Sequence, residues 1–524
     1  MNREVAVRIG IVSVFVDYHR RGRRNALALQ PQIGPLLAGL LPADAQIEVI
    51  NETSQALDFR RHYDLLFISA LHSDLDRARQ ISHYYRRRGT ATVFGGSLAS
   101  SYPLLVQAYF DSVVIGDPES TVPQLYRDFC EHRLKPLYRS GPYRADSVAT
   151  PRFGLLAGRA PLGFALEASR GCPYACEFCV LSGLGTRYET RSVGQVIDDI
   201  RHGQAQLASC GHRLRHRLVG FTDNNLGGSL GFLRELCDAL KPMKLRWYCA
   251  VTFNVIANRE LVRAMSDAGC ICVFVGLESF NPAALADMHK YQNVAHKTRA
   301  AIDCCREHGM LVISGLMLSP QIDTLDYIER LPTLVRDAGL HVPTFLCFES
   351  PIPGTPHFKR LAAEDGAFLP NALLRDFTGY TLVTRPRHAG VAEFLDAYRK
   401  ACGEIFSIGN RLRKLADDTP RFLSAGRPGA AVVDALDMIG LQGVFPPPAS
   451  RSLIAGSDTA PPERVPLTDA DFDSAAERAA ILEPMAVTDA HGKVLPQWLH
   501  SQQPFAEPAE AKAGRRRSLK LVAA

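Results

Sequence analysis

Three cysteines close together are the residues of this chain best suited to metal chemistry. They lie in Arg170-Gly-Cys-Pro-Tyr-Ala-Cys-Glu-Phe-Cys179, with the spacing C-x3-C-x2-C. A [4Fe–4S] cube normally takes one thiolate per iron, so three adjacent thiolates can hold one face and leave the fourth iron open. An open iron can bind the amino and carboxylate groups of S-adenosylmethionine (SAM), and an electron passed through the cluster can then release a 5′-deoxyadenosyl radical. The spacing predicts such a redox-active cluster on Cys172, Cys176 and Cys179.

Two other interpretations of this triplet stay open. One is a zinc site in a non-enzymatic, zinc-stapled binding protein, with Cys210 or His212 as a distant fourth ligand. Structural zinc sites usually pair two C-x2-C knuckles, and the sequence has no second one. The other interpretation is three unrelated core cysteines. The chain has 13 cysteines, an odd number, so a disulfide framework is not expected. We expect Cys270, Cys272, Cys304 and Cys305 to be small buried hydrophobic residues.

Six apolar segments that alternate with amphipathic ones surround the triplet and extend beyond it. The strand candidates are Gly163–Glu167, Leu218–Thr222, Leu245–Val251, Ile271–Gly276, Leu311–Leu318 and Pro343–Phe348. Because the intervening segments have helical periodicity, this pattern predicts a partial TIM-like (β/α)6 barrel. Its chemistry would lie at the carboxyl ends of the strands, where the cysteines follow the first one.

An earlier alternation predicts a separate Rossmann-like domain. Its strand candidates are Arg8–Val14, Gln46–Ile50, Asp64–Ser69, Ala91–Phe94 and Ser112–Ile115. Strands that alternate with helices form a doubly wound parallel sheet, and ligands bind in the loops at the carboxyl ends of its strands. We therefore expect an α/β protein with two ligand-binding sheets.

The composition of the chain gives the expected domain limits and the expected location in the cell. We expect the Rossmann-like domain at 1–138, a linker at 139–161, the barrel at 162–358, a helical region at 359–445 and an irregular, partly disordered tail at 446–524. No stretch is long and apolar enough to span a bilayer, and no signal peptide is recognised, so a cytoplasmic location is expected. The 60 basic residues nearly balance the 54 acidic ones, and nucleic acid is not an expected partner.

The barrel segment resembles the radical SAM superfamily. The triplet with Phe178 before its last cysteine matches the family signature, which implies that Phe178 packs near the adenine of SAM. Asp223 and Asn224 stand where the family often has a Gly-Gly-Glu motif for the SAM amino group, although that motif is absent. The resemblance also implies that Gly276-Leu-Glu-Ser279 places Glu278 and Ser279 near the ribose, and that Gly315 passes the adenine. Ser279 has an equal alternative as a helix N-cap.

The first domain resembles the cobalamin-binding module of one radical SAM branch, in which the loop Pro351-Ile-Pro-Gly-Thr-Pro356 is also common. The matching stretches are Ile68-Ser-Ala-Leu71, Phe94-Gly-Gly-Ser97 and Val114-Ile-Gly-Asp-Pro-Glu119. The resemblance implies cobalamin contacts from Ser69, Gly95 and Gly96. The stretch Asp17-Tyr-His-Arg-Arg-Gly22 also matches a corrinoid D-x-H-x-x-G motif, which makes His19 a possible cobalt ligand. The alternative is a basic surface loop.

Together these resemblances imply a class B type methyltransferase of the radical SAM superfamily. Such an enzyme transfers a methyl group from cobalamin to the carbon of a small-molecule or natural-product substrate and takes electrons from flavodoxin or ferredoxin. Ring formation or cleavage without methyl transfer is the alternative within the same branch. Methylthio transfer to RNA is not expected, because that chemistry needs further N-terminal cysteines and only Cys130 precedes Cys172.

Overall fold

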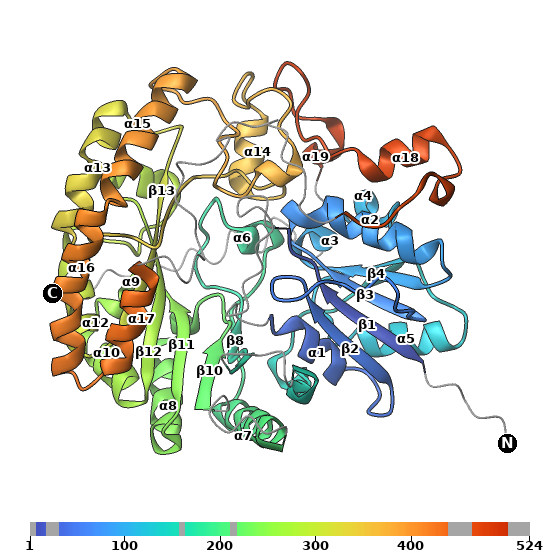
Figure 1. Cartoon of the computed structure of the whole chain (residues 1–524), viewed down its shortest axis with the longest axis horizontal. Helices are drawn as coiled ribbons and strands as arrows, with labels where there is room; N and C mark the ends of the chain where they lie inside the picture. Colours follow the sequence, from blue (N-terminus) through green and yellow to red (C-terminus); the bar gives the residue numbers. More distant parts are fainter. Residues whose placement is uncertain (1–6, 17–30, 157–162, 210–216, 439–463, 501–524) are drawn as a thin grey trace, which may run out of the picture.

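Two parallel β-sheets lie side by side and form the body of the molecule (Figure 1). The computed structural model describes residues 7–16, 31–156, 163–209, 217–438 and 464–500. The predicted fold class is confirmed: a Rossmann-like part, a second parallel sheet and a helical and irregular C-terminal part. The predicted roles of Asp17 and His19 lie outside the described residues.

The first sheet has six parallel strands in the order β2-β1-β3-β4-β5-β6. They are β1 (Arg8–Ser13), β2 (Gln46–Asn51), β3 (Leu65–Ser69), β4 (Ala91–Gly95), β5 (Ser112–Ile115) and β6 (Leu137–Arg139). The five predicted strands are confirmed, whereas β6 was missed because three residues show no periodicity. Since β1 lies between β2 and β3, the chain leaves β1 on one side and later returns to its other side. Such a switch point opens a crevice at the carboxyl ends of the strands.

Helices cover both faces of this sheet. Helices α1 (Ile33–Gly39) and α5 (Val122–Cys130) pack on one face, and the opposite face carries α2 (Leu75–Arg86), α3 (Ser97–Ser101) and α4 (Pro103–Gln107). Alternate residues of β3 enter different cores, Leu65 and Phe67 on one side and Leu66 and Ile68 on the other. Burial on both faces explains why the strands are continuous apolar runs.

The second sheet is a six-stranded open barrel with the order β14-β13-β12-β11-β10-β7. Its parallel strands are β7 (Phe164–Leu166), β10 (Leu218–Phe221), β11 (Arg246–Val251), β12 (Cys270–Glu278), β13 (Leu311–Leu318) and β14 (Phe345–Phe348). All six predicted strands are confirmed. Strand β12 continues two residues beyond the prediction, and its register with β13 shifts between Gly276 and Glu278.

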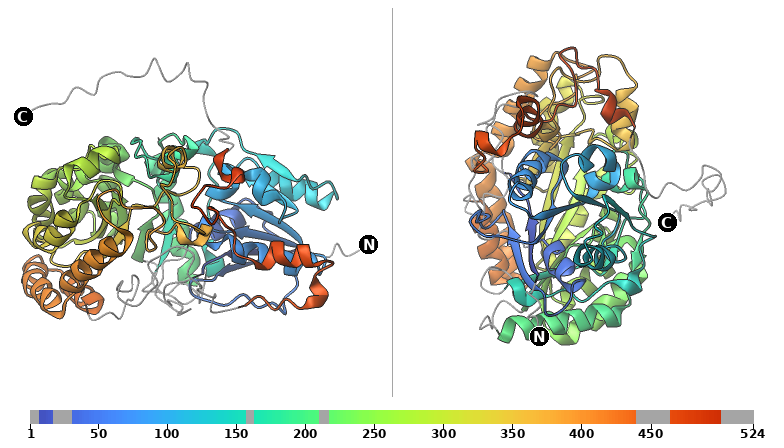
Figure 2. Two further views of the ribbon diagram at one scale, coloured as in Figure 1. Left: turned by 90° about the horizontal axis from the view of Figure 1, so that it is seen from above. Right: turned by 90° about the vertical axis from the view of Figure 1, so that its right-hand side faces the viewer.

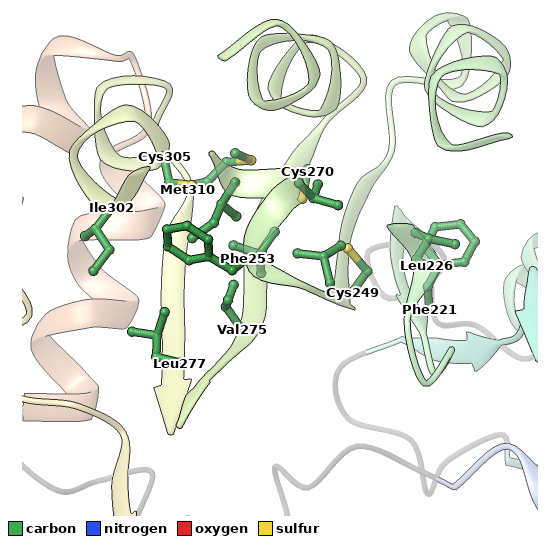
Figure 3. Packing of buried hydrophobic residues seen from close by; sticks show 14 of the residues in the cluster. Phe221, Leu226, Cys249, Phe253, Cys270, Val275, Leu277, Ile302, Cys305 and Met310 are labelled. Carbon is green, nitrogen blue, oxygen red and sulfur yellow. The ribbon is translucent and has the colours of Figure 1, made fainter. Parts of the chain in front are cut away.

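Helices α7 (Val193–Ser209), α8 (Leu230–Leu240), α10 (Arg259–Asp267), α12 (Thr298–Glu307) and α13 (Leu325–Asp337) enclose the barrel. Between strands and helices lies a continuous core in which Cys249, Cys270 and Cys305 pack among aliphatic and aromatic side chains (Figure 3). Cys270, Cys304 and Cys305 are buried as expected, whereas Cys272 is only half-buried.

The C-terminal part divides between the two sheets (Figure 2). Helices α15 (Val391–Ile405), α16 (Ile408–Ser424) and α17 (Pro428–Met438) lie on the barrel, in line with the predicted helical region. Residues 464–500 instead pack on the first sheet through α18 (Ala475–Leu482) and α19 (Pro496–Leu499). Trp498 is 1% exposed and its ring packs against Tyr102. Residues 464–500 have little regular structure beyond these short helices, and a few buried apolar side chains anchor them on the first sheet. The domain limits stay a prediction.

Candidate active site

A short antiparallel ribbon holds the cysteine loop at the mouth of the barrel. Strand β8 (Ser169–Arg170) precedes the cysteines, and β9 (Glu189–Thr190) follows them and pairs with β8. Gly171 has a φ of 83°, and a Cβ atom at this position would overlap the carbonyl oxygen of Arg187. Only glycine fits here, so Gly171 lets the ribbon close directly before Cys172.

Asp223 fixes the strand that leads into this loop. Its carboxylate accepts hydrogen bonds from the Ala168 amide at 3.1 Å, from the Ser169 amide and from the Ser169 hydroxyl at 2.5 Å. Burial raises the pKa of Asp223 to about 7, and these donors oppose the rise. The carboxylate is thus occupied by the chain itself. Asp223 fixes the start of the cysteine loop, and its contact with the SAM amino group stays a prediction.

Each of the three cysteine sulfurs has an N–H donor. Asn225 Nδ2 lies 3.7 Å from Cys172 Sγ, and Gln292 Nε2 lies 3.9 Å from Cys176 Sγ. Cys179 precedes the short helix α6 (Val180–Leu184), and the amides of Leu181 and Ser182 donate to its sulfur. N–H donors stabilise thiolates, and thiolates are the form that binds iron. This donor set therefore fits three cluster ligands.

A nearby cation, the Lys290 ammonium, favours the thiolate form of two of the cysteines. Burial raises the pKa of Cys176 and of Cys179, and the Lys290 ammonium opposes this rise at both thiols. Among the described residues, no three His, Cys, Asp or Glu side chains converge closely enough for a single metal ion. A cube bonds its ligands at separate iron atoms and does not need three side chains around one ion. The zinc interpretation, with Cys210 or His212 as the fourth ligand, falls outside the described residues.

Lys290 and Glu278 form a buried ion pair beside the loop. Their Nζ and Oε1 atoms are 2.6 Å apart, and Nζ lies 5.6 Å from the centre of the Phe178 ring. Glu278 has a φ of 62°, at the register shift of β12. Asn293 Nδ2 fixes the same turn by donating to the carbonyls of Gly276 at 2.9 Å and Leu277 at 2.8 Å. Lys290, Gln292 and Asn293 were missed because no recognisable motif marks them.

Two other predicted SAM contacts are occupied by protein side chains. The Ser279 hydroxyl lies 3.1 Å from Tyr327 Oη and accepts from the Asn281 amide at 3.0 Å. The N-cap of α11 (Pro282–Asp287) is Asn281, so the alternative of Ser279 as N-cap is wrong. At Gly315, a Cβ atom would overlap the ring of Phe345. The absence of a side chain at Gly315 leaves space for the Phe345 ring. From the sequence pattern alone, the same glycine could equally leave space for adenine.

A cavity of about 500 Å³ lies between the carboxyl ends of the first sheet and the cysteine loop. Helix α6 sits between the two sheets, against α3 (Figure 1). The structure brings four predicted residues together in the cavity wall: Ser69, Gly95, Gly96 and Asn224. Gly96 has a φ of 126°, which favours glycine, and its backbone can therefore lie against a ligand.

Arg170 joins the two sides of this cavity. Its guanidinium lies 2.9 Å from Asp117 Oδ1, 2.9 Å from Glu119 Oε1 and 2.7 Å from Glu167 Oε2. Burial raises the pKa of Asp117 and of Glu167, and Arg170 opposes both shifts. Asp117 and Glu119 belong to the loop after β5, whereas Arg170 stands two residues before Cys172. The network thus ties the first domain to the cysteine loop.

Gln32 adds an unpartnered amide to the same wall. Its Oε1 accepts from Thr222 Oγ1 at 2.7 Å, so the nitrogen cannot take that partner. The side chain is buried, and Nε2 has no hydrogen-bond partner among the described residues. A buried donor normally has an acceptor, and a ligand in the cavity can supply one. No sequence motif indicated Gln32.

The Pro351–Pro356 loop braces the cysteine loop from the barrel side. Thr355 caps helix α14 (Pro356–Ala362) by accepting from the Phe358 amide at 3.1 Å. From this helix, Arg360 donates to Glu177, between two of the cysteines, and to Asp287, both at 2.9 Å. The His357 amide also donates to the Glu177 carbonyl at 3.1 Å, and this bond fixes the backbone of the loop.

A buried acid–base pair links the end of β14 to helix α14. Glu349 follows β14, and its Oε1 lies 3.2 Å from His357 Nδ1. Burial raises the pKa of Glu349 to about 8 and lowers the pKa of His357 to about 4. Both groups are therefore uncharged near neutral pH.

Residues 166–331 match the model of the Radical SAM superfamily. These residues therefore form a radical SAM domain. The bacteriochlorophyllide d C-8(2)-methyltransferase of Chlorobaculum tepidum is 27% identical over 331 residues, which cover 61% of this chain and 73% of the relative. The hopanoid C-2 methylase of Rhodopseudomonas palustris is 25% identical over 353 residues, 65% of each chain.

Among solved structures, the chain resembles TsrM from Kitasatospora setae, a radical SAM methyltransferase with cobalamin and a [4Fe–4S] cluster bound. The TM-score is 0.55 at 19% identity, and the match covers 74% of this chain and 84% of TsrM. At this identity the likeness concerns the fold, with a Rossmann-like part followed by an open barrel.

Proposed function

We propose that this radical SAM enzyme is a cobalamin-dependent methyltransferase that acts on the carbon of a small molecule. The observation that carries the proposal is the cavity that places Ser69, Gly95 and Gly96 opposite the cysteine loop. The relatives from Chlorobaculum and Rhodopseudomonas are named as methyl-transferring enzymes, and TsrM binds both cofactors. Their names support methyl transfer here but not a particular substrate.

The cluster half of the site would use Cys172, Cys176 and Cys179 as ligands. When bound, such a cluster supplies reductive cleavage of SAM to a 5′-deoxyadenosyl radical, and cobalamin supplies a methyl group. Asn225 and Gln292 would hold the thiolates in orientation. Phe178 and the Lys290–Glu278 pair would border SAM, because Phe178 stands between two of the cysteines and Lys290 pairs with Glu278 at the carboxyl end of β12.

The cavity half of the site would hold the corrin. Gly95 and Gly96 present backbone without side chains, which suits a flat macrocycle. Amide groups on a corrin edge can donate to the carboxylates of Asp117 and Glu167 and accept from Gln32 Nε2. Arg170 connects these carboxylates to the cysteine loop. The residues that would bind the corrin and those that would bind the cluster are therefore held in a fixed position relative to each other.

A small-molecule substrate and a one-electron donor such as flavodoxin or ferredoxin complete the proposal. We place the enzyme in the cytoplasm, where reductants keep thiols available for a cluster. Within the described residues, no helix combines the length and the apolar character needed to cross a lipid bilayer.

The test uses the full chain, reconstituted anaerobically with iron and sulfide, mixed with hydroxocobalamin and gel-filtered. We expect about four iron atoms per chain, from the composition of a [4Fe–4S] cluster, together with bound cobalt and corrin absorbance. With reductant and SAM, the holoenzyme should form S-adenosylhomocysteine only when cobalamin is present. A gel-filtered protein with iron but without cobalt would contradict the cobalamin assignment, and a protein without iron would contradict the cluster.

A further inference from the structure

We propose that Asn225 and Gln292 set the reduction potential of the cluster by donating N–H hydrogen bonds to Cys172 and Cys176. The inference rests on the proposed function, since it requires a cluster on these thiols. The inference gives a role to two side chains that contact the cysteine sulfurs but would not bind the cluster itself. They act through the sulfurs, so they are tuning residues and not catalytic ones.

The amide of Asn225 is oriented for this role. The side chain is 1% exposed, and Nδ2 lies 3.7 Å from Cys172 Sγ. Its Oδ1 lies 3.4 Å from the hydroxyl of Thr252, whose shorter hydrogen bond, at 2.6 Å, goes to Asn254 Oδ1. Rotating the Asn225 amide by 180° would turn its oxygen toward the sulfur and repel a thiolate. The thiolate form of Cys172 therefore favours the orientation with the N–H group on the sulfur.

Gln292 reaches the second sulfur from a different element. It lies in the loop after α11, with Nε2 3.9 Å from Cys176 Sγ. Two neighbours anchor that loop to the end of β12, Lys290 through Glu278 at 2.6 Å and Asn293 through the Gly276 carbonyl at 2.9 Å. The two donors thus come from loops after different barrel strands, and each serves one sulfur.

The electrostatic consequence follows from the charge of the cluster. Reduction adds one electron, supplied in the test by dithionite, and no bond forms or breaks. Part of the added negative charge resides on the thiolate sulfurs, so an N–H donor stabilises the reduced form more than the oxidised form. Hydrogen bonds to sulfur are one of the properties that set iron–sulfur potentials. Because Asn225 is buried, its dipole is weakly screened by water.

The experiment measures the midpoint potential by redox titration with electron paramagnetic resonance, on reconstituted full-length protein without SAM. Asn225→Leu and Gln292→Leu should each shift the potential to more negative values, and the double variant should shift it by about the sum. Asn225→Asp should shift it further than Asn225→Leu, because it replaces the donor by a negative charge. Gln195→Leu changes a half-buried amide at the start of α7 whose oxygen accepts from Ser192; it is the control and should leave the potential unchanged.

Iron content and circular dichroism identify any variant that fails to fold or to bind a cluster. Asn225→Asp and Gln292→Leu keep the test valid if Asn225→Leu does not fold. Potentials equal to wild type in the cluster-containing variants at Asn225 and Gln292 would overturn the inference, while the cluster itself would stand. Absence of iron from the wild-type protein would instead overturn the proposed function.

Discussion

Arg170 and Glu119 are joined by two hydrogen bonds, Nη2 to Oε1 at 2.9 Å and Nη1 to Oε2 at 3.2 Å. The pair connects the strand before the cysteines with the loop after β5. The Glu119 side chain is 4% exposed and that of Arg170 is 13% exposed, so water screens the interaction weakly. The first domain and the cysteine loop are therefore held together by charge as well as by packing.

We predict that Arg170→Met lowers the free energy of unfolding by about 3 kcal/mol, the usual cost of leaving buried charges unpaired. Glu119, Glu167 and Asp117 would all lose their cation. Urea unfolding monitored by circular dichroism measures the change. The matched control is Arg201→Met, whose pair with Asp198 is exposed, and it should change stability by less than about 0.5 kcal/mol. Equal effects of the two substitutions would contradict a special role of Arg170.

Cysteine variants separate cluster ligands from core thiols. Cys172→Ala, Cys176→Ala and Cys179→Ala should each abolish release of 5′-deoxyadenosine from SAM under dithionite, because three ligands are needed to hold the cube. Cys130→Ala and Cys402→Ala should retain it, since Cys130 is exposed on α5 and Cys402 is buried in the barrel core. Chromatography of the product measures the outcome. Activity in the triple alanine variant would refute the cluster assignment.

Gln32 should contribute to corrin affinity. Gln32→Leu removes the buried donor of the cavity, and the loss of one hydrogen bond corresponds to an increase of about 5-fold to 10-fold in the Kd for hydroxocobalamin. Titration followed by corrin absorbance or by quenching of protein fluorescence gives the Kd. Gln195→Leu alters a half-buried side chain at the start of α7, outside the cavity wall, and serves as the control. An unchanged Kd in Gln32→Leu would show that the amide does not face the corrin.

The Glu349–His357 pair predicts a pH dependence of stability. The pKa of Glu349 rises from 4.5 to about 8 on folding, so the folded state binds more protons and stability falls as pH rises through this range. The pKa of His357 falls from 6.5 to about 4, so stability falls as pH drops through that range. The two effects oppose each other between about 4.5 and 6.5. Above about 6.5 only the Glu349 effect remains.

Glu349→Gln should therefore reduce the fall in the free energy of unfolding as the pH rises above about 6.5. Between pH 6.5 and 8, wild-type stability should fall relative to the variant by up to about 2 kcal/mol, from 1.36 kcal/mol per pH unit. Urea unfolding at pH 5.5, 6.5, 7.5 and 8.5 measures both curves. Only the difference in slope is compared, since the substitution also changes the contact with His357. Parallel curves above pH 6.5 would show that Glu349 is ionised in the folded protein.

The sequence by itself determined the two sheets and the cysteine loop. Apolar runs alternating with amphipathic segments identified eleven of the twelve strands of the two large sheets, since strands buried on both faces must be continuously apolar. The C-x3-C-x2-C spacing likewise needs no tertiary information, because its three thiols come from one loop. Ser69, Gly95 and Gly96 could be placed at one edge because the carboxyl ends of parallel strands meet there.

The tertiary structure alone decided which side chains serve the site. Asp223 and Ser279 have the residue types of ligand contacts, yet their polar atoms are taken by Ser169 and by Tyr327. Asn225 and Gln292 bond to sulfurs 53 and 116 residues away, and Gln32 accepts from Thr222, 190 residues away. Partners this distant leave no local pattern in the sequence. The local periodicity of apolar residues specifies the helices and strands and where each one ends. The partner of a polar side chain depends on how distant loops fold together, and only the packed chain specifies that.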